Sequence, residues 1–330
     1  MKDLQEEQMS QNKVEEEQEL IWYFAIGSMM NPTSCALREF HPKESHPAKL
    51  LDYEIQFFSS MGFAEAVPSK GSCMHGVVHH VTKEQMKQLD TIELGYIRQN
   101  GTAELYHGGT IPVTVYCRPR NDPHSNDPLT SNSSSSNNNN NTINRAPRQR
   151  YLEILIAGAK HWGVDPEYVR MLERHDFQPR QLPHEFLTLE APPAGSPHYE
   201  TVPESTDTTL YCTLNGKLLE ITYPKDHSYY GMFRMFFERH GPHLEIAHCH
   251  LAYDIKYGVP RTISDVTREH AAYIEDAQVR YLKMPELRSD NGAVSDENEP
   301  KYFRVIGTYA QKYKDENDDD GKDDGAKESN

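Results

Sequence analysis

The sequence has few hydrophobic residues and no long hydrophobic run. Hydrophobic residues make up 36% of the 330 positions, and no run approaches the ~18 apolar residues that a membrane-spanning helix needs. The amino-terminal stretch is acidic and has no apolar core of signal-peptide length. The low hydrophobic content also indicates that part of the chain does not pack into a core. We therefore expect a cytoplasmic protein that does not bind a membrane.

Paired cysteines and basic stripes are absent as well. The 5 cysteines are widely scattered and form no CxxC pair, and such a set is typical of reduced thiols rather than of a disulfide framework. No cluster of lysine and arginine is present to neutralise phosphates, which argues against nucleic acid as a partner.

The acidic charge lies mainly at the two ends of the chain. The net charge is −16, and residues 1–20 hold seven acids against two lysines, while residues 315–330 hold eight acids against two lysines. The remainder is close to balanced, so the acidity indicates solvated tails rather than an acidic binding face.

Two short stretches contain the residues best suited to catalysis. Residues 23–32 read YFAIGSMMNP, a strand-like run that ends abruptly at Gly27-Ser28, where a turn can aim backbone N–H groups at a ligand. Residues 89–98 read LDTIELGYIR, in which Glu93 follows a short apolar helix pattern and precedes a predicted strand. One carboxylate facing one glycine turn is enough to move a proton within a small amide substrate.

These stretches resemble the gamma-glutamylcyclotransferase family. Its signature is a strand ending in YGSN and, later, an LDxxEG-type segment that carries the catalytic glutamate. Between the two stretches, PAKLLDYEIQFFSSMGFAEAVPSKGSCMHGVVHHVT resembles the middle of the family, and YLEILIAGAKHWGVDPEYVRMLERHDF is similar to the helical end of the animal enzymes. The resemblance covers about residues 22–180 and implies a small mixed β-barrel with flanking helices.

The resemblance also implies a reaction. In a γ-glutamyl amide the α-amino group closes a five-membered ring on the δ-carbonyl and releases 5-oxoproline by intramolecular aminolysis. Glu93 is then the general acid and base, and we expect partial burial to raise its pKa. The γ-glutamyl group would lie against the loop and two tyrosines: Tyr23, Phe24, Ala25, Ile26, Gly27, Ser28, Tyr96 and Tyr116. The reaction requires no metal and no other cofactor.

The sequence departs from the family pattern at three places. The YGSN tyrosine is Ile26, the asparagine is Met29, and the glycine expected directly after the glutamate is Leu94, with Gly95 one place later. Each lost hydrogen bond could cost ~1 kcal/mol or more. A changed acyl group or a weakened activity therefore stays open.

Other functions stay open too. Glu93 could merely cap or bridge a surface turn, and the chain could then be a non-catalytic module that binds a ligand or a partner. A close enzymatic alternative is cleavage of a γ-glutamyl amine or of a γ-glutamyl-protected pathway intermediate, while free glutathione is less favoured. The expected partner is a small γ-glutamyl compound, and homodimerisation is left open.

We divide the chain into five segments. Residues 1–20 and 311–330 are predicted to be disordered acidic tails. Residues 21–180 form the gamma-glutamylcyclotransferase-like domain, with a low-complexity insertion at 121–149. Residues 181–203 are a proline-rich linker, and 204–310 form a smaller α+β module of unknown function.

Sequence patterns predict the elements of both parts. In the first we predict strands over 21–26, 50–59, 66–81, 96–106 and 110–117, and helices near 31–32, over 82–89 and 151–161, and from 165–166 onward. In the second we predict a hairpin of strands 208–214 and 217–222 around Asn215-Gly216, helices over 229–239 and 264–282, and strands over 244–253 and 301–309.

Four histidines in RHGPHLEIAHCH are the one cluster with metal-ligating side chains. His248 and His250 would share one face of the predicted strand at 244–253, with Cys249 and Asp254 nearby. The spacing matches no standard zinc motif, so we predict an ordinary polar strand face and no metal site.

Overall fold

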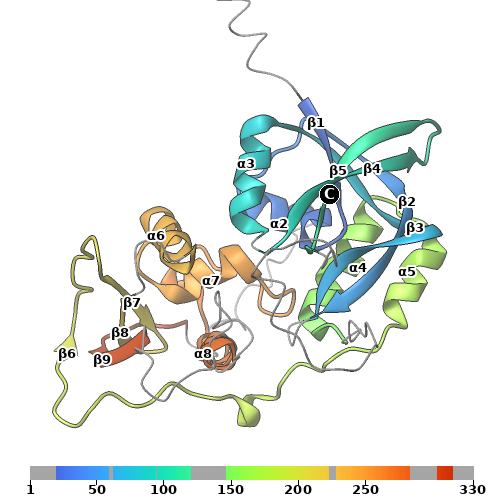
Figure 1. Ribbon diagram of the computed structural model, residues 1–330. Coiled ribbons are helices and arrows are strands. Elements are labelled where there is room, and N and C mark those ends of the chain that lie inside the picture. The colour runs from blue at the N-terminus through green and yellow to red at the C-terminus, as the bar shows by residue number, and fades with distance from the viewer. Residues whose placement is uncertain are drawn as a thin grey trace, which may run out of the picture. The chain divides into compact units, whose positions relative to one another are not determined.

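The computed structural model describes residues 20–58, 62–93, 95–119, 146–222, 228–282 and 303–314. The chain divides into two compact units at Arg180 and Gln181 (Figure 1). Most of the predicted tails and of the insertion at 121–149 lies outside the described residues, as does Leu94.

Five strands of the first unit close into a barrel (Figure 1). They are β1 (Leu20–Ala25), β2 (Glu44–Phe58), β3 (Phe63–Thr82), β4 (Ile97–Leu105) and β5 (Thr110–Cys117). The order around the barrel is β1-β3-β2-β4-β5, with antiparallel neighbours except for β1 and β5, which are parallel. The predicted mixed β-barrel is therefore confirmed.

Strands β2 and β3 are longer than their predicted ranges at 50–59 and 66–81. Pro47, Ser69 and Gly71 interrupt the β-forming pattern of the sequence, but the two strands pair along nearly their whole length. Their register shifts between Leu51 and Tyr53, where Asp52 has a φ of 61° and its Oδ1 accepts a hydrogen bond from the Gly71 N–H at 2.8 Å. Cross-strand hydrogen bonds thus extend the strands past residues with poor β propensity.

The described residues of the first unit form four α-helices, and three of them begin at a capping residue. The four helices are α2 (Pro32–Leu37), α3 (Lys83–Ile92), α4 (Gln149–His161) and α5 (Pro166–Glu173). Asn31 caps α2, Thr82 and Gln85 form a capping box on α3, and Asp165 caps α5. These starts were predicted from the same residues in the sequence.

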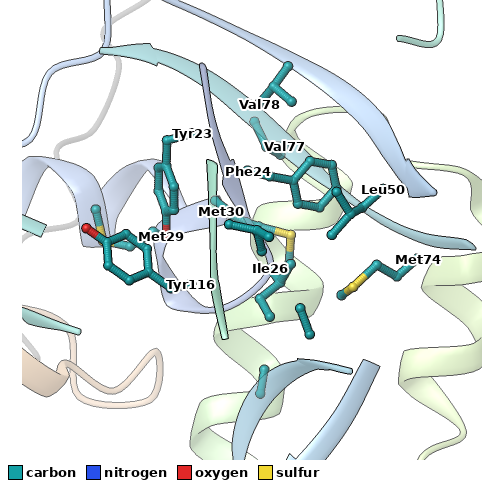
Figure 2. Close-up of a cluster of buried hydrophobic side chains, with 14 of the residues drawn as sticks. Tyr23, Phe24, Ile26, Met29, Met30, Leu50, Met74, Val77, Val78 and Tyr116 are labelled. Carbon is teal, nitrogen blue, oxygen red and sulfur yellow. The ribbon is translucent and has the colours of Figure 1, made fainter. Parts of the chain in front are cut away.

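The barrel strands enclose an apolar core (Figure 2). Side chains from β1, β2 and β3 meet there with exposed fractions of 0% or 1%: Phe24, Leu50, Met74, Val77 and Val78. Burial of such side chains removes apolar area from water and stabilises the barrel. The rigid core therefore fixes the positions at which β1 ends and α3 begins.

The second unit combines a four-stranded sheet with three α-helices. The sheet order is β6-β9-β8-β7, formed by β6 (His198–Tyr199), β7 (Leu210–Leu214), β8 (Lys217–Ile221) and β9 (Phe303–Tyr309). The helices are α6 (Ser228–His240), α7 (Leu244–Ala252) and α8 (Arg268–Leu282). Asn215 and Gly216 have φ angles of 48° and 73°, as a type I′ hairpin turn requires, so the predicted hairpin is confirmed.

The predicted strand over 244–253 is wrong, because these residues form helix α7. Leu244, Ile246, Ala247 and Cys249 are all buried, so the helix is apolar on several sides and has no single stripe by which the sequence could identify it. Positions two apart on a helix point about 200° away from each other, so His248 and His250 do not share a face. No group of three metal-ligating side chains occurs within the described residues.

The predicted helix over 264–282 also begins later than expected. A 3-10 turn, η3 (Ile263–Asp265), comes first, and Asp265 accepts a hydrogen bond from the Thr262 N–H at 2.8 Å. This local bond competes with helix propagation, so α8 starts only at Arg268. Within the described stretches, every helix is too short or too polar to span a lipid bilayer.

Candidate active site

Glu93 lies in the tight turn that connects α3 to β4. It is the C-cap of α3, and its N–H donates a hydrogen bond to the Leu89 carbonyl at 2.8 Å. Its own carbonyl accepts one from the Tyr96 N–H at 3.1 Å. Gly95 in between has a φ of 83°, a conformation that favours glycine. The sequence Glu-Leu-Gly-Tyr therefore builds a turn that fixes the backbone of the acidic residue.

The environment of Glu93 keeps its carboxyl group poised near neutral pH. Burial raises the pKa of Glu93 to about 7, and the nearby Arg38 guanidinium opposes part of this shift. Glu93 is half-buried. None of the described residues donates a hydrogen bond to its carboxylate. A half-buried carboxyl with this pKa can both accept and return a proton.

Three tyrosine hydroxyls lie within the electrostatic field of Glu93. Burial raises the pKa of Tyr23, Tyr96 and Tyr151, and the negative charge of Glu93 raises each of them further. All three hydroxyls therefore stay protonated at neutral pH, and the Tyr96 hydroxyl donates its proton to the Ala64 carbonyl at 3.0 Å. The sequence analysis named Tyr23 and Tyr96, and the structure brings both near Glu93.

The glycine turn after β1 is a short 3-10 helix, η1 (Ser28–Met30), preceded by Gly27. The Met30 N–H donates to the Gly27 carbonyl at 3.0 Å, and Trp162 Nε1 of the segment after α4 donates to the Met30 carbonyl at 2.9 Å. The N–H groups of Ser28 and Met29 have no backbone acceptor among the described residues. They are free to bind a developing negative charge.

Tyr151 on α4 connects this turn with Glu93, and the sequence analysis missed it. A Cβ atom built on Gly27 would meet the Tyr151 hydroxyl at 2.8 Å, so only glycine permits this close approach. The hydroxyl accepts a hydrogen bond from the Ala64 N–H at 3.2 Å, which leaves its proton available to donate. Tyr151 also lies in the electrostatic field of Glu93. The Gly27 turn and the Glu93 carboxyl therefore both lie near the Tyr151 hydroxyl.

Tyr116 and Phe24 present no free side-chain group to the candidate site. The Tyr116 ring packs edge-on against Tyr23 with centroids 5.8 Å apart, but its hydroxyl donates to Asp90 Oδ1 at 2.7 Å and is thus already bound. Phe24 is 1% exposed and points into the core (Figure 2). It can contribute only backbone atoms to the site, as can its neighbour Ala25, which is fully buried.

Part of the chain is similar to known proteins. Residues 23–135 match the model of the family described as gamma-glutamyl cyclotransferase, AIG2-like. The resemblance to that family is confirmed for this part of the chain. A search of curated proteins finds no match.

Several solved structures are similar to part of the chain. A gamma-glutamyl cyclotransferase is 22% identical, with a TM-score of 0.38, and covers 48% of this chain and 90% of its own. An uncharacterized protein from Homo sapiens is 21% identical, with a TM-score of 0.38, and covers 49% and 90%. YkqA from Bacillus subtilis is 17% identical, with a TM-score of 0.39, and covers 50% and 58%.

The two departures from the cyclotransferase YGSN loop are both buried apolar side chains. Ile26 is 8% exposed and Met29 is 2% exposed, and Figure 2 shows them among the buried side chains around β1. The Met29 carbonyl still accepts hydrogen bonds from His79 Nε2 at 3.0 Å and Cys35 Sγ at 3.1 Å. The substitutions therefore exchange polar groups for apolar packing, while the backbone of the turn stays anchored.

Proposed function

We propose that the first unit is a cyclotransferase that releases 5-oxoproline from γ-glutamyl amides, with Glu93 as general acid and base. The observation that carries the proposal is the placement of a carboxyl with a pKa of about 7 beside three protonated tyrosine hydroxyls and the glycine turn. The match of residues 23–135 to the cyclotransferase family model supports it.

The chemistry follows from this placement. The α-amino group of the substrate reacts as the neutral amine and attacks the δ-carbonyl carbon to form a new C–N bond, and Glu93 takes the extra proton that the attacking nitrogen then carries. The oxyanion that forms accepts hydrogen bonds from the N–H groups of Ser28 and Met29. Glu93 returns the proton to the leaving nitrogen, the original C–N bond breaks, and 5-oxoproline and a free amine are released.

The hydroxyls of Tyr23 and Tyr151 would donate hydrogen bonds to the γ-glutamyl group, and the Tyr96 hydroxyl would accept one from it. The Tyr96 hydroxyl donates to the Ala64 carbonyl at 3.0 Å, and Tyr151 accepts from the N–H of the same residue. Both rings are thus locked onto β3, which fixes their hydroxyls before substrate arrives.

A non-catalytic binding module is the second candidate function. Ile26 and Met29 favour it, because they remove two polar side chains that the family signature carries. Such a module would bind a γ-glutamyl compound at the same hydroxyls without turning it over.

Release of 5-oxoproline from a panel of γ-glutamyl amino acids, γ-glutamyl amines and glutathione tests the proposal. We expect Glu93→Gln to lower kcat by about 10²-fold or more, since the amide cannot shuttle a proton. Glu84→Gln is the matched control, because Glu84 is an exposed residue in the first turn of the same helix. Folded protein that turns over no member of the panel would contradict the proposal and favour the binding module.

A further inference from the structure

A buried histidine on β3 joins the glycine turn to the barrel. His79 is 1% exposed, and it lies opposite Tyr23 on β1 and Ser45 on β2 in the strand register. Its Nε2 is 3.0 Å from the Met29 carbonyl oxygen, and its Nδ1 is 2.7 Å from Ser45 Oγ. Both ring nitrogens therefore have a partner, one in the turn and one on the neighbouring strand.

The two partners determine which ring nitrogen of His79 carries the proton. Burial lowers the pKa of His79 to about 4, so at neutral pH the ring is uncharged and has a single N–H. The Met29 carbonyl oxygen can only accept a hydrogen bond, so this proton lies on Nε2. Nδ1 then accepts a hydrogen bond from the Ser45 hydroxyl. Ser45 thus directs the one N–H of His79 toward the turn.

The hydrogen bond from His79 reaches the candidate oxyanion site through two peptide groups. The C=O and N–H of a trans peptide point in opposite directions, and the described peptides are all trans. In the peptide that joins Met29 to Met30, the carbonyl accepts the hydrogen bond from His79. The N–H of this peptide donates to the Gly27 carbonyl at 3.0 Å. That bond holds the next peptide, so its N–H, which belongs to Ser28, is directed away from the Gly27 carbonyl.

We propose that His79 is a positioning residue for the reaction, because it holds the Ser28 N–H in place for the oxyanion that forms at the δ-carbonyl. This inference rests on the proposed cyclotransferase function. Hydrogen bonds in a row polarise one another, so the relay also makes the Ser28 N–H a stronger donor. The donor acts where charge develops in the transition state, so His79 affects turnover rather than substrate binding.

The rival explanation of His79 is packing. Its ring centroid lies between 6.0 and 6.2 Å from those of three aromatic rings, which belong to Phe40, Tyr23 and Trp162. Contacts of this kind stabilise a core, and a buried histidine needs partners for its nitrogens whether or not a reaction depends on it. On this explanation, activity would fall only as far as the fold is weakened.

Two substitutions at His79 separate the ring from its donor. His79→Gln keeps an N–H donor at about the place of Nε2 and loses the ring, whereas His79→Phe keeps a ring and loses the donor. The Cys35 thiol, a weak donor, also contacts the Met29 carbonyl at 3.1 Å, so loss of His79 loosens the turn without releasing it. On the fastest substrate of the γ-glutamyl panel, we expect His79→Phe to lower kcat by about tenfold or more and to leave KM within about twofold.

We expect the order of stability to be the reverse of the order of activity. His79→Phe still packs against the three neighbouring rings, so in thermal unfolding it should be the more stable variant. His79→Gln should be the less stable one and yet retain most of kcat. His80→Gln and His80→Phe are the matched controls, since His80 is the next residue of β3, faces the other way and stacks on Trp22. Neither control should change kcat.

The tautomer of His79 provides a readout that does not depend on turnover. We expect ¹⁵N NMR of the imidazole, assigned by the loss of its signals in a His79 variant, to show the proton on Nε2. Ser45→Ala removes the partner of Nδ1 and should lower kcat by about threefold or more, the scale of one neutral hydrogen bond. Ser45 is only partly buried, so this variant tests the relay even if a substitution at His79 prevents folding.

The outcomes for His79 and for the cyclotransferase are distinguishable. If the wild type turns over substrate but kcat follows thermal stability across the His79 variants, the inference is overturned and the cyclotransferase stands. A ring proton found on Nδ1, or an unchanged kcat in Ser45→Ala and His79→Phe, has the same consequence. Turnover of no substrate by folded wild type would overturn both proposals together.

Discussion

The Glu93 carboxyl should couple activity to pH. Its pKa is raised to about 7 by burial, and only the ionised form can take a proton from the substrate amine. We therefore predict that kcat/KM rises as the pH rises through about 7, in a profile measured with γ-glutamyl-alanine between pH 5 and 9. A fall in kcat/KM at acid pH that is centred near the ordinary glutamate pKa would contradict the assignment of Glu93 as the general base.

The same group should affect stability with the opposite sign. A carboxyl whose pKa is raised on folding stabilises the folded state when it is protonated, and this stabilisation is lost as the pH rises toward 7. In Glu93→Gln the amide stays neutral, so thermal unfolding above pH 7 should show a variant at least as stable as the wild type. The gain in stability then comes from removing a half-buried charge, and the loss of activity comes from removing the group that carries the proton.

At the level of single residues, the sequence draws attention to the groups of the candidate site that have distinctive chemistry and not to the one that resembles a core residue. Glu93 and Gly27-Ser28 stand out because a lone acid and a glycine turn have few other uses in an apolar segment. Tyr151 lies on the same helical stripe as Leu155, so a sequence pattern cannot distinguish its hydroxyl from packing. Only the approach of Gly27 to that hydroxyl reveals its position in the site.

Among the elements, α3 depends on Asp90 for its attachment to the barrel. Asp90 accepts hydrogen bonds from Arg98 Nε at 2.8 Å and Nη2 at 2.6 Å, and from the Tyr116 hydroxyl at 2.7 Å. Arg98 lies on β4 and Tyr116 on β5. Asp90 therefore ties the last turn of the helix that carries Glu93 to two strands.

We predict that Asp90→Ala lowers kcat more than it changes KM, because it loosens the turn that positions Glu93. The cost in stability should be only ~1 kcal/mol, since Asp90 and Arg98 are both partly exposed. Asp90→Asn keeps the acceptor for Tyr116 and should restore part of kcat. Steady-state kinetics together with thermal unfolding measure both effects, and unchanged kinetics in Asp90→Ala would show that the attachment does not position Glu93.

The elements also show where sequence patterns suffice and where they fail. Helices with a capping residue and one apolar face, such as α3 and α5, were predicted from local chemistry. Helix α7 was predicted as a strand because it is buried on several sides, and its contacts with the rest of its unit, which the sequence does not display, decide its conformation.

On the scale of a whole unit, buried titratable groups limit the pH range over which the second unit is stable. Glu245 is 0% exposed, and burial raises its pKa to about 7. Its Oε1 accepts hydrogen bonds from Asn215 N, Gln311 Nε2 and Tyr313 Oη. Its Oε2 and Gln311 Oε1 are both buried and receive no hydrogen bond from the described residues, which favours the protonated, neutral form of Glu245. At the acid end, burial lowers the pKa of His270 to about 4.

We predict that the second unit loses stability as the pH rises through about 7, where Glu245 must ionise, by up to about 3 kcal/mol. The loss accumulates between the ordinary pKa of 4.5 and the raised pKa of about 7, so hydrogen exchange of the β7–β8 hairpin amides between pH 4.5 and 8, corrected for intrinsic rates, measures the effect. Glu245→Gln should remove this dependence, whereas Glu204→Gln, at an exposed position, should retain it. An identical dependence in both variants would contradict the prediction.

The parallel pairing of β1 with β5 has a consequence for the order of events during folding. Tyr23 lies opposite Thr114 across this seam, so the first and last strands of the barrel meet only after the segments between them have taken their register. Contacts this distant in sequence form slowly, because the loop between them must be closed first. Tyr23 on β1 and the Glu93 turn before β4 come together across that closure. During synthesis the candidate site is therefore complete only after the whole barrel has left the ribosome.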